Sequence, residues 1–353
     1  MTFDVYFDVL SRTADPDEWE AALAGIVEQA QRAEPAEVQT ALERLVQGMR
    51  AMPFFFAQDL AQVIGAVAGL GTDPLVVLPV LVERATEVLE SAALFAGLCE
   101  ADLGEIPDLT DESTAREALA RFTELARRRS LDAHEAELLM QAWMSADQLV
   151  QPLLVLCQRA DARAALPGRE RLAAAIEPVR ERLGTPSWLA GLLEVLDDEP
   201  LIVLDRGFAG TGRGYRVTIG GIADNFQLHT LLAAALISSP ADGRADETLL
   251  PGRPPTEIEI AAASTGDPAP EGGITGSWNM IDANGDWIWN EGKPAYIPHH
   301  DGVRVIVLDA APYERSWNAG RVYPLMLPAL HVDGPLTPQE AAALLSQVKP
   351  ASR

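Results

Sequence analysis

The character of this chain changes at residue 200, and that change constrains the fold more than any single motif. Residues 1–200 hold 35 Asp and Glu against 16 Arg, whereas residues 201–353 hold 17 acidic residues against 11 basic ones. Seventeen of the 27 glycines lie in the second part. Regular apolar spacing with few glycines indicates helices, and frequent glycines beside alternating apolar residues indicate strands and turns. The sequence therefore predicts an acidic all-helical domain at residues 1–198 and an α+β domain at residues 199–353.

Proline marks several predicted helix starts in the first part. Asp15-Pro16, Asp73-Pro74 and Thr185-Pro186 each place a side-chain acceptor at the N-cap and proline at the first helical position. Behind the first of these, Trp19, Leu23, Ile26 and Ala30 recur at helical spacing and are expected to face a core. Further helices are predicted at 54–69 and 75–97, both nearly all apolar and expected to be covered on most sides, and at 132–159, 168–183 and 187–196. A HEAT-like stack of helical hairpins and a compact bundle both fit this pattern.

The second part predicts a sheet with helices around it. Strands are expected at 201–205, 215–219, 257–260 and 303–308, the last of them central because its apolar run is nearly continuous. Asp224 is expected to cap one helix, and the capping box from Thr337 to Glu340 opens the final one. We therefore predict an α+β domain whose sheet is mixed or mainly antiparallel.

Charge and composition exclude several classes of protein. A net charge of −25 argues against binding to nucleic acid, because that binding depends on Lys and Arg at the phosphates. Cys99 and Cys157 lie in apolar helical patterns and are expected to be buried, reduced thiols. The first residues lack the pattern of a secretory signal, and the most apolar stretches are too short to span a membrane. A cytoplasmic location without a metal or cofactor is expected.

A glycine-rich segment at 207–214 follows the first predicted strand. A phosphate loop would be followed by a helix, but residues 215–219 have the pattern of a strand and no Lys-Ser or Lys-Thr pair follows the glycines. We therefore interpret the segment as a hairpin loop. Arg206, Arg213 and Arg216 form the basic cluster at which an anionic ligand would bind.

The Asn284-Gly285 pair predicts a β-hairpin with a type I′ turn between 278–282 and 286–290. A calcium loop beginning at Asp282 is rejected, because the sixth and twelfth positions of an EF-hand loop hold Trp287 and Lys293 here. Trp287 and Trp289 share one face of this hairpin. They are expected to pack in the core or between domains, and the alternative is stacking on a flat ligand or a partner.

His299-His300-Asp301 is the one histidine cluster in the sequence. Adjacent residues of an extended segment point to opposite sides, so at most two of the three could face one metal ion. A zinc site needs at least three protein ligands, and no nucleophile motif accompanies these residues. We therefore expect these three residues to be polar groups of a turn beside a strand.

These observations favour a protein-interaction or scaffold function. The acidic helical domain would present a surface to a protein partner of basic character, since dense negative charge steers basic proteins. The alternative is an enzyme or small-ligand binder that combines the loop at 206–216 with His299, His300 and Asp301. A third hypothesis is inhibition of a basic partner by acidic mimicry.

Overall fold

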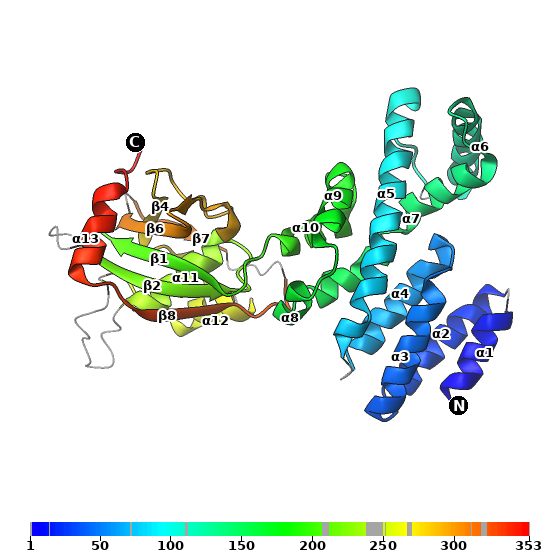
Figure 1. Cartoon of the computed structure of the whole chain (residues 1–353), viewed down its shortest axis with the longest axis horizontal. Coiled ribbons are helices and arrows are strands. Elements are labelled where there is room, and N and C mark those ends of the chain that lie inside the picture. Colours follow the sequence, from blue (N-terminus) through cyan, green and yellow to red (C-terminus); the bar gives the residue numbers. More distant parts are fainter. Residues whose placement is uncertain are drawn as a thin grey trace. The chain divides into compact units, whose positions relative to one another are not determined.

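The computed structural model describes residues 2–13, 15–70, 73–109, 112–206, 212–237, 250, 252–266, 270–311, 313–318 and 323–352. The glycines of the predicted hairpin loop at 207–210 lie outside these residues. The chain divides into two compact units, one made of residues 1–157 with 161–193 and the other of residues 158–160 with 194–353. The helical unit precedes the α+β unit, as Figure 1 shows, which confirms the predicted fold class.

The first unit consists of helices joined by short connections. They are α1 Phe3–Arg12, α2 Pro16–Ala30, α3 Pro35–Met49, α4 Phe54–Ala68, α5 Leu78–Leu103, α6 Glu112–Arg128, α7 Ala133–Leu156, α8 Ala160–Ala164, α9 Arg169–Ile176 and α10 Gly184–Leu193, with single 3₁₀ turns η1 Pro74–Val76 and η2 Glu177–Val179. Pro178 lies in η2, which follows α9 within the helical segment predicted at 168–183. Helix α7 packs against α4, α5, α6 and α10.

Two of the three predicted proline caps differ from the prediction. Asp15 caps α2 as expected, because its carboxylate accepts the N–H of Asp17 at 2.9 Å. Asp73 instead caps the 3₁₀ turn η1, and α5 begins later, at Leu78. Thr185 lies inside the first turn of α10, where its N–H bonds to the carboxylate of Asp147 on α7 at 2.7 Å. Asp147 of α7 therefore bonds a free N–H at the start of α10, which the sequence had predicted Thr185 to cap.

The described residues of the second unit form a six-stranded sheet, a two-stranded sheet and several helices. Its elements are β1 Glu199–Asp205, β2 Arg213–Gly220, α11 Asn225–Leu236, α12 Glu257–Thr265, β3 Ile274–Thr275, β4 Trp278–Asp282, η4 Pro294–Tyr296, β5 His299–His300, β6 Val303–Ala310, β7 Ser316–Trp317, β8 Ala329–Pro335 and α13 Pro338–Gln347. The sheet order is β4-β6-β1-β2-β8, with β5 also paired to β6. Strands β6 and β1 are parallel and the other pairs antiparallel, so the sheet is mixed, as predicted.

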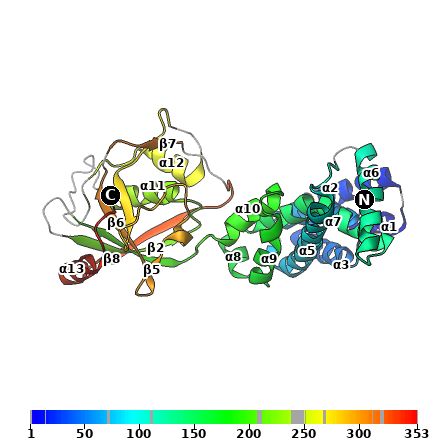
Figure 2. The same ribbon diagram turned by 90° about the horizontal axis from the view of Figure 1, so that it is seen from above.

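Both faces of the sheet are covered, which explains the nearly continuous apolar run of β6. Ile306 and Leu308 face the cluster that includes α11, whereas Val305 and Val307 face the cluster under α13. Figure 2 shows α11 and α12 on one side of the strands and α13 on the other. Asp224 and Thr337 cap α11 and α13 as predicted.

The predicted strand at 257–260 is wrong, because these residues begin helix α12. Thr256 accepts the N–H of Glu259, and Glu259 accepts the N–H of Thr256 in return, which makes a capping box. Glu259 is also buried and accepts the N–H of Thr275. The alternation of Ile and Glu suggested a strand, but the cap and the alanines that follow favour a helix.

The predicted type I′ turn is also wrong, although the chain does reverse direction there. Only Gly285 has a positive φ among the described residues of the turn, at 85°, and a type I′ turn needs two. The Asp282 carboxylate accepts the N–H groups of Asn284 and Asp286 at 2.8 and 3.0 Å and so holds a three-residue loop. Beyond it, pairing with β4 is reduced to a single bridge at Trp287.

The cysteines are buried and free, as expected. Burial raises the pKa of Cys99 to about 11 and that of Cys157 to about 12, so both are neutral thiols near pH 7. Among the helices described, none has an apolar stretch of the length needed to cross a membrane.

The predicted domain boundary at 198 leads to the first testable expectation. A fragment of residues 1–197 should be soluble and helical and should unfold cooperatively, because the helical unit has its own core. Circular dichroism and thermal unfolding of the fragment beside the whole chain test this. An aggregated or unfolded fragment would mean that the two parts fold as one.

Candidate functional site: a groove between α2 and α4

A groove of about 860 Å³ lies in the helical unit. One wall is a stripe along α2 from Pro16 to Val27, and the other is a stripe along α4 from Phe55 to Val63. Met52 and Pro53, just before α4, line it further. The groove therefore follows two helices over several turns.

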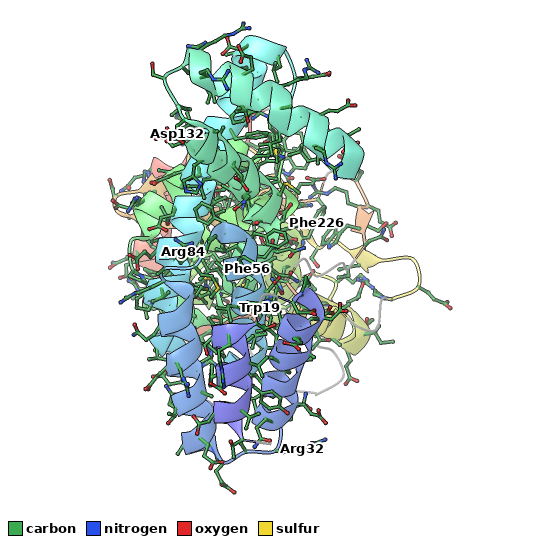
Figure 3. The ribbon with its side chains drawn as sticks, turned by 90° about the vertical axis from the view of Figure 1, so that its right-hand side faces the viewer. Trp19, Arg32, Phe56, Arg84, Asp132 and Phe226 are labelled. Atoms are coloured by element: carbon green, nitrogen blue, oxygen red, sulfur yellow. The ribbon has the colours of Figure 1, made fainter. Side chains whose placement is uncertain are left out.

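Exposed aromatic side chains line this groove. Phe55 and Phe56 are 51% and 43% exposed, although they lie in a helix that the sequence predicted to be covered on most sides. The ring of Phe56 meets that of Trp19 edge to face, with centroids 5.5 Å apart, and Figure 3 shows these two residues near each other. Trp19 is partly buried along the groove and not in the core, where its spacing had placed it. Large exposed aromatic groups of this kind are typical of binding surfaces.

Every ionisable side chain among the described residues that line the groove is a carboxylate: Asp15, Glu20 and Asp59. Asp15 caps α2 and Glu20 is exposed. Asp59 lies in the middle of the α4 stripe, where it accepts a hydrogen bond of 3.2 Å from the indole N–H of Trp19. Burial raises the pKa of Asp59; the bond from Trp19 partly opposes this effect, and the charge of Glu20 adds to it. The groove thus combines apolar walls with uncompensated negative charge.

Arg84 of α5 contacts residues at the start of α4, at one end of the groove. Its guanidinium is buried, lies 4.8 Å from the ring centroid of Phe54, and donates a hydrogen bond of 2.6 Å to the carbonyl of Met52. It also pairs with Glu87 on its own helix. These contacts hold the start of α4, and with it Phe55 and Phe56, in one position.

The residues predicted from sequence to bind a ligand lie elsewhere, in the α+β unit. Arg206 follows β1 and pairs with Asp309, with 3.1 Å between Nε and Oδ1. Arg213 begins β2 opposite Asp205. Arg216, further along β2, pairs with Glu340 of α13 at 3.0 Å. Arg206 and Arg216 thus both take part in ion pairs that tie elements of this unit together.

The predicted histidine cluster lies at the opposite end of β6 from Arg206. His299 and His300 form β5 and Asp301 turns into the start of β6, whereas Arg206 meets the end of that strand. The six steps from residue 303 to 309 span about 20 Å, so the described residues do not bring the two groups into one site. His299 contacts Glu199, and His300 contacts Gln347 of α13, so the imidazoles have different partners.

Trp287 and Trp289 were expected to pack in the core or between domains, and the structure shows that they do not lie in the core of the α+β unit. They are 40% and 63% exposed and stack on each other with centroids 5.0 Å apart. Ile288 between them faces the core instead. Alternation along the chain turns the two indoles away from the core, and the guanidinium of Arg315 lies 5.5 Å from the ring centroid of Trp287.

Possible metal ligands and a second hollow are weaker candidates for a functional site. Within the described part of the chain, no three His, Cys, Asp or Glu side chains are placed to hold a metal ion. A smaller hollow of about 510 Å³ lies between the end of α5 and α6. Its walls mix both charges, and Arg129 there is already paired with Asp102 at 2.8 Å. We therefore take the α2–α4 groove as the candidate site.

Sequence reasoning missed this groove, although one signal was present. Phe54, Phe55 and Phe56 are consecutive, and successive residues of a helix point about 100° apart, so the three rings cannot share one buried face. At least one aromatic ring at the start of α4 had to point away from the core. That Trp19 lies beside it could not be inferred, because the contact joins residues about forty positions apart.

No protein-family model matches this chain, and neither a curated protein nor a solved structure shows significant similarity to it.

Proposed function

We propose that this protein is a protein-interaction module and that the helical unit binds a partner through the groove between α2 and α4. The observation that carries the proposal is the combination of exposed Phe55 and Phe56 with a lining whose ionisable groups are all acidic. Aromatic side chains in a pocket are the usual anchors of protein interfaces. The net charge of −19 over residues 1–200 adds attraction for a basic partner.

Site-specific photo-crosslinking of the whole chain in its own cells tests this proposal. A photoreactive residue at Ala24, which is exposed and lines the groove, should form an adduct with one partner. The matched control at Ala21, exposed on α2 but outside the lining, should not. Phe56→Ser should abolish the adduct without unfolding the helix, because the ring is already half exposed. Equal adducts from Ala24 and Ala21, or an adduct that survives Phe56→Ser, would contradict the proposal.

Association with that partner should weaken steeply as ionic strength rises past about 0.15 M, where the Debye length is about 8 Å. The reason is that screening removes the long-range attraction between the acidic unit and a basic partner. Dissociation constants of the purified partner measured across a salt series check this expectation. Constants that do not change with salt would show that apolar contacts alone drive recognition.

A further inference from the structure

We infer that the groove accommodates one amphipathic α-helix of about three turns, with a Lys or Arg in the middle of its apolar face that pairs with Asp59. This inference rests on the proposed function, because it names the class of partner for the same groove. It follows from the shape of the walls, from the hydrogen-bonding groups they offer and from the position of the charge.

The walls match the length of a short helix. The α2 stripe runs from Pro16 to Val27 and the α4 stripe from Phe55 to Val63. At 1.5 Å per residue these stripes are about 16 and 12 Å long. Along both, the lining residues recur every three or four positions, which is the surface that one helix presents to another. A partner with apolar anchors at the same spacing would fill the groove as a third helix.

The walls favour a helix over an extended peptide. Both are α-helices, whose N–H and C=O groups are bonded within each helix except at its ends. An extended peptide laid along these apolar stripes would leave its own backbone groups without partners. A helix satisfies its backbone internally and needs only side-chain contacts, so it binds such a surface without that penalty.

Asp59 determines where the partner carries its positive charge. Its carboxylate accepts the indole N–H of Trp19 and has capacity for further hydrogen bonds. Glu20 adds a second negative charge nearby, and no cation lines this part of the described groove. An apolar side chain placed against Asp59 would bury a carboxylate without compensation, whereas Lys or Arg would form a charge-assisted hydrogen bond.

Calorimetry of the whole chain with two designed peptides tests the inference. Both are neutral helical peptides of about 14 residues with a stripe of Leu, and they differ at the centre of that stripe, which holds Lys in one and norleucine in the other. We expect the Lys peptide to bind about ten-fold or more tightly than the norleucine peptide. Asp59→Asn, which keeps an acceptor for Trp19, should reduce that preference to about two-fold or less. Asp17→Asn is the matched control, since Asp17 is an exposed carboxylate of α2 outside the groove lining.

The outcomes separate this inference from the proposed function. A preference for Lys that persists in Asp59→Asn, or equal binding of both peptides, overturns the role of Asp59 and leaves the groove as a docking site. If Phe56→Ser does not weaken either peptide, or if neither peptide binds, the helix is the wrong occupant. In that case a crosslink from Ala24 would still support the proposed function. The absence of any crosslink would contradict both the helical occupant and the proposed function.

Discussion

Gly285→Val should destabilise the α+β unit by about 3–5 kcal/mol, the largest effect we expect from a single substitution in this unit. Two causes add. Gly285 has φ at 85°, where a β-branched residue is strained. A Cβ atom there would also overlap the carbonyl oxygen of Pro350, in the C-terminal segment that packs on this turn. That segment is held by the N–H of Ser352 on the carbonyl of Gly285 at 2.8 Å, so the substitution should release it.

Gly302→Val separates the two causes. Gly302 also has φ at 85°, but no atom lies within 4 Å of the position its Cβ would take. We expect it to lose about 1–3 kcal/mol, from backbone strain alone. Urea unfolding and the proteolytic sensitivity of residues 349–352 measure both effects. Equal losses in the two variants would show that the contact with Pro350 contributes nothing.

Calcium should change the midpoint of neither the wild type nor Gly285→Val. Oδ1 of Asp282 accepts two backbone N–H groups of the turn, and among the described residues Asp282 belongs to no group of three His, Cys, Asp or Glu side chains placed to hold an ion. Stabilisation of the wild type by calcium would show that this loop is a metal site after all.

Acidification should destabilise the α+β unit through His229. This imidazole is 1% exposed, and its Nε2 accepts the N–H of Ser277 at 2.9 Å. Burial, together with the positive charge of Arg315, lowers the pKa of His229 from 6.5 to about 4. Because the unfolded chain gains a proton near pH 6.5 and the folded chain does not, the penalty begins at that pH and grows as the pH falls towards 4. At pH 5 it should reach about 2 kcal/mol, and near pH 4 about 3 kcal/mol.

The variant His229→Gln isolates this contribution. Gln can accept the same backbone N–H but does not titrate. Between pH 7.5 and pH 5, the unfolding free energy of His229→Gln should therefore fall by about 2 kcal/mol less than that of the wild type. His134→Gln is the matched control, because His134 is exposed on α7. Urea unfolding of the three proteins at several pH values tests the expectation. If the unfolding free energies of the wild type and His229→Gln change with pH in parallel, the buried imidazole takes up a proton in the folded state as readily as in the unfolded chain.

Local signals in the sequence determined much of the architecture. The change in glycine content and apolar spacing at residue 200 predicted a helical region followed by an α+β part, because spacing reflects which side of each element is buried. Asp15, Asp224 and Thr337 predicted helix starts correctly, since a cap needs only the first turn of its own helix. The apolar run at 303–308 predicted a central strand for a similar reason.

Two of the errors arose where residues far apart in the chain are in contact. Thr185 does not cap α10 but donates its own N–H to Asp147 of α7, and the turn at Gly285 is held by the C-terminal segment as well as by Asp282. Residues 257–260 alternate like a strand, yet they form a helix whose Glu259 is buried by contacts with other segments. The first two outcomes involve contacts between residues far apart in the chain, which periodicity and composition do not encode. The capping box of α12, in contrast, is a local signal that the alternation of Ile and Glu obscured.

The candidate site likewise depends partly on local sequence and partly on tertiary packing. The sequence alone determined that three aromatic rings at 54–56 could not all be buried on one helix face, and that the surrounding unit is strongly acidic. Only the tertiary structure decided that Trp19 lies against Phe56 and that its indole N–H bonds to Asp59 in the α4 stripe. The physical reason is that a groove is the space between two elements, and its position is set by how α2 and α4 pack and not by either sequence segment.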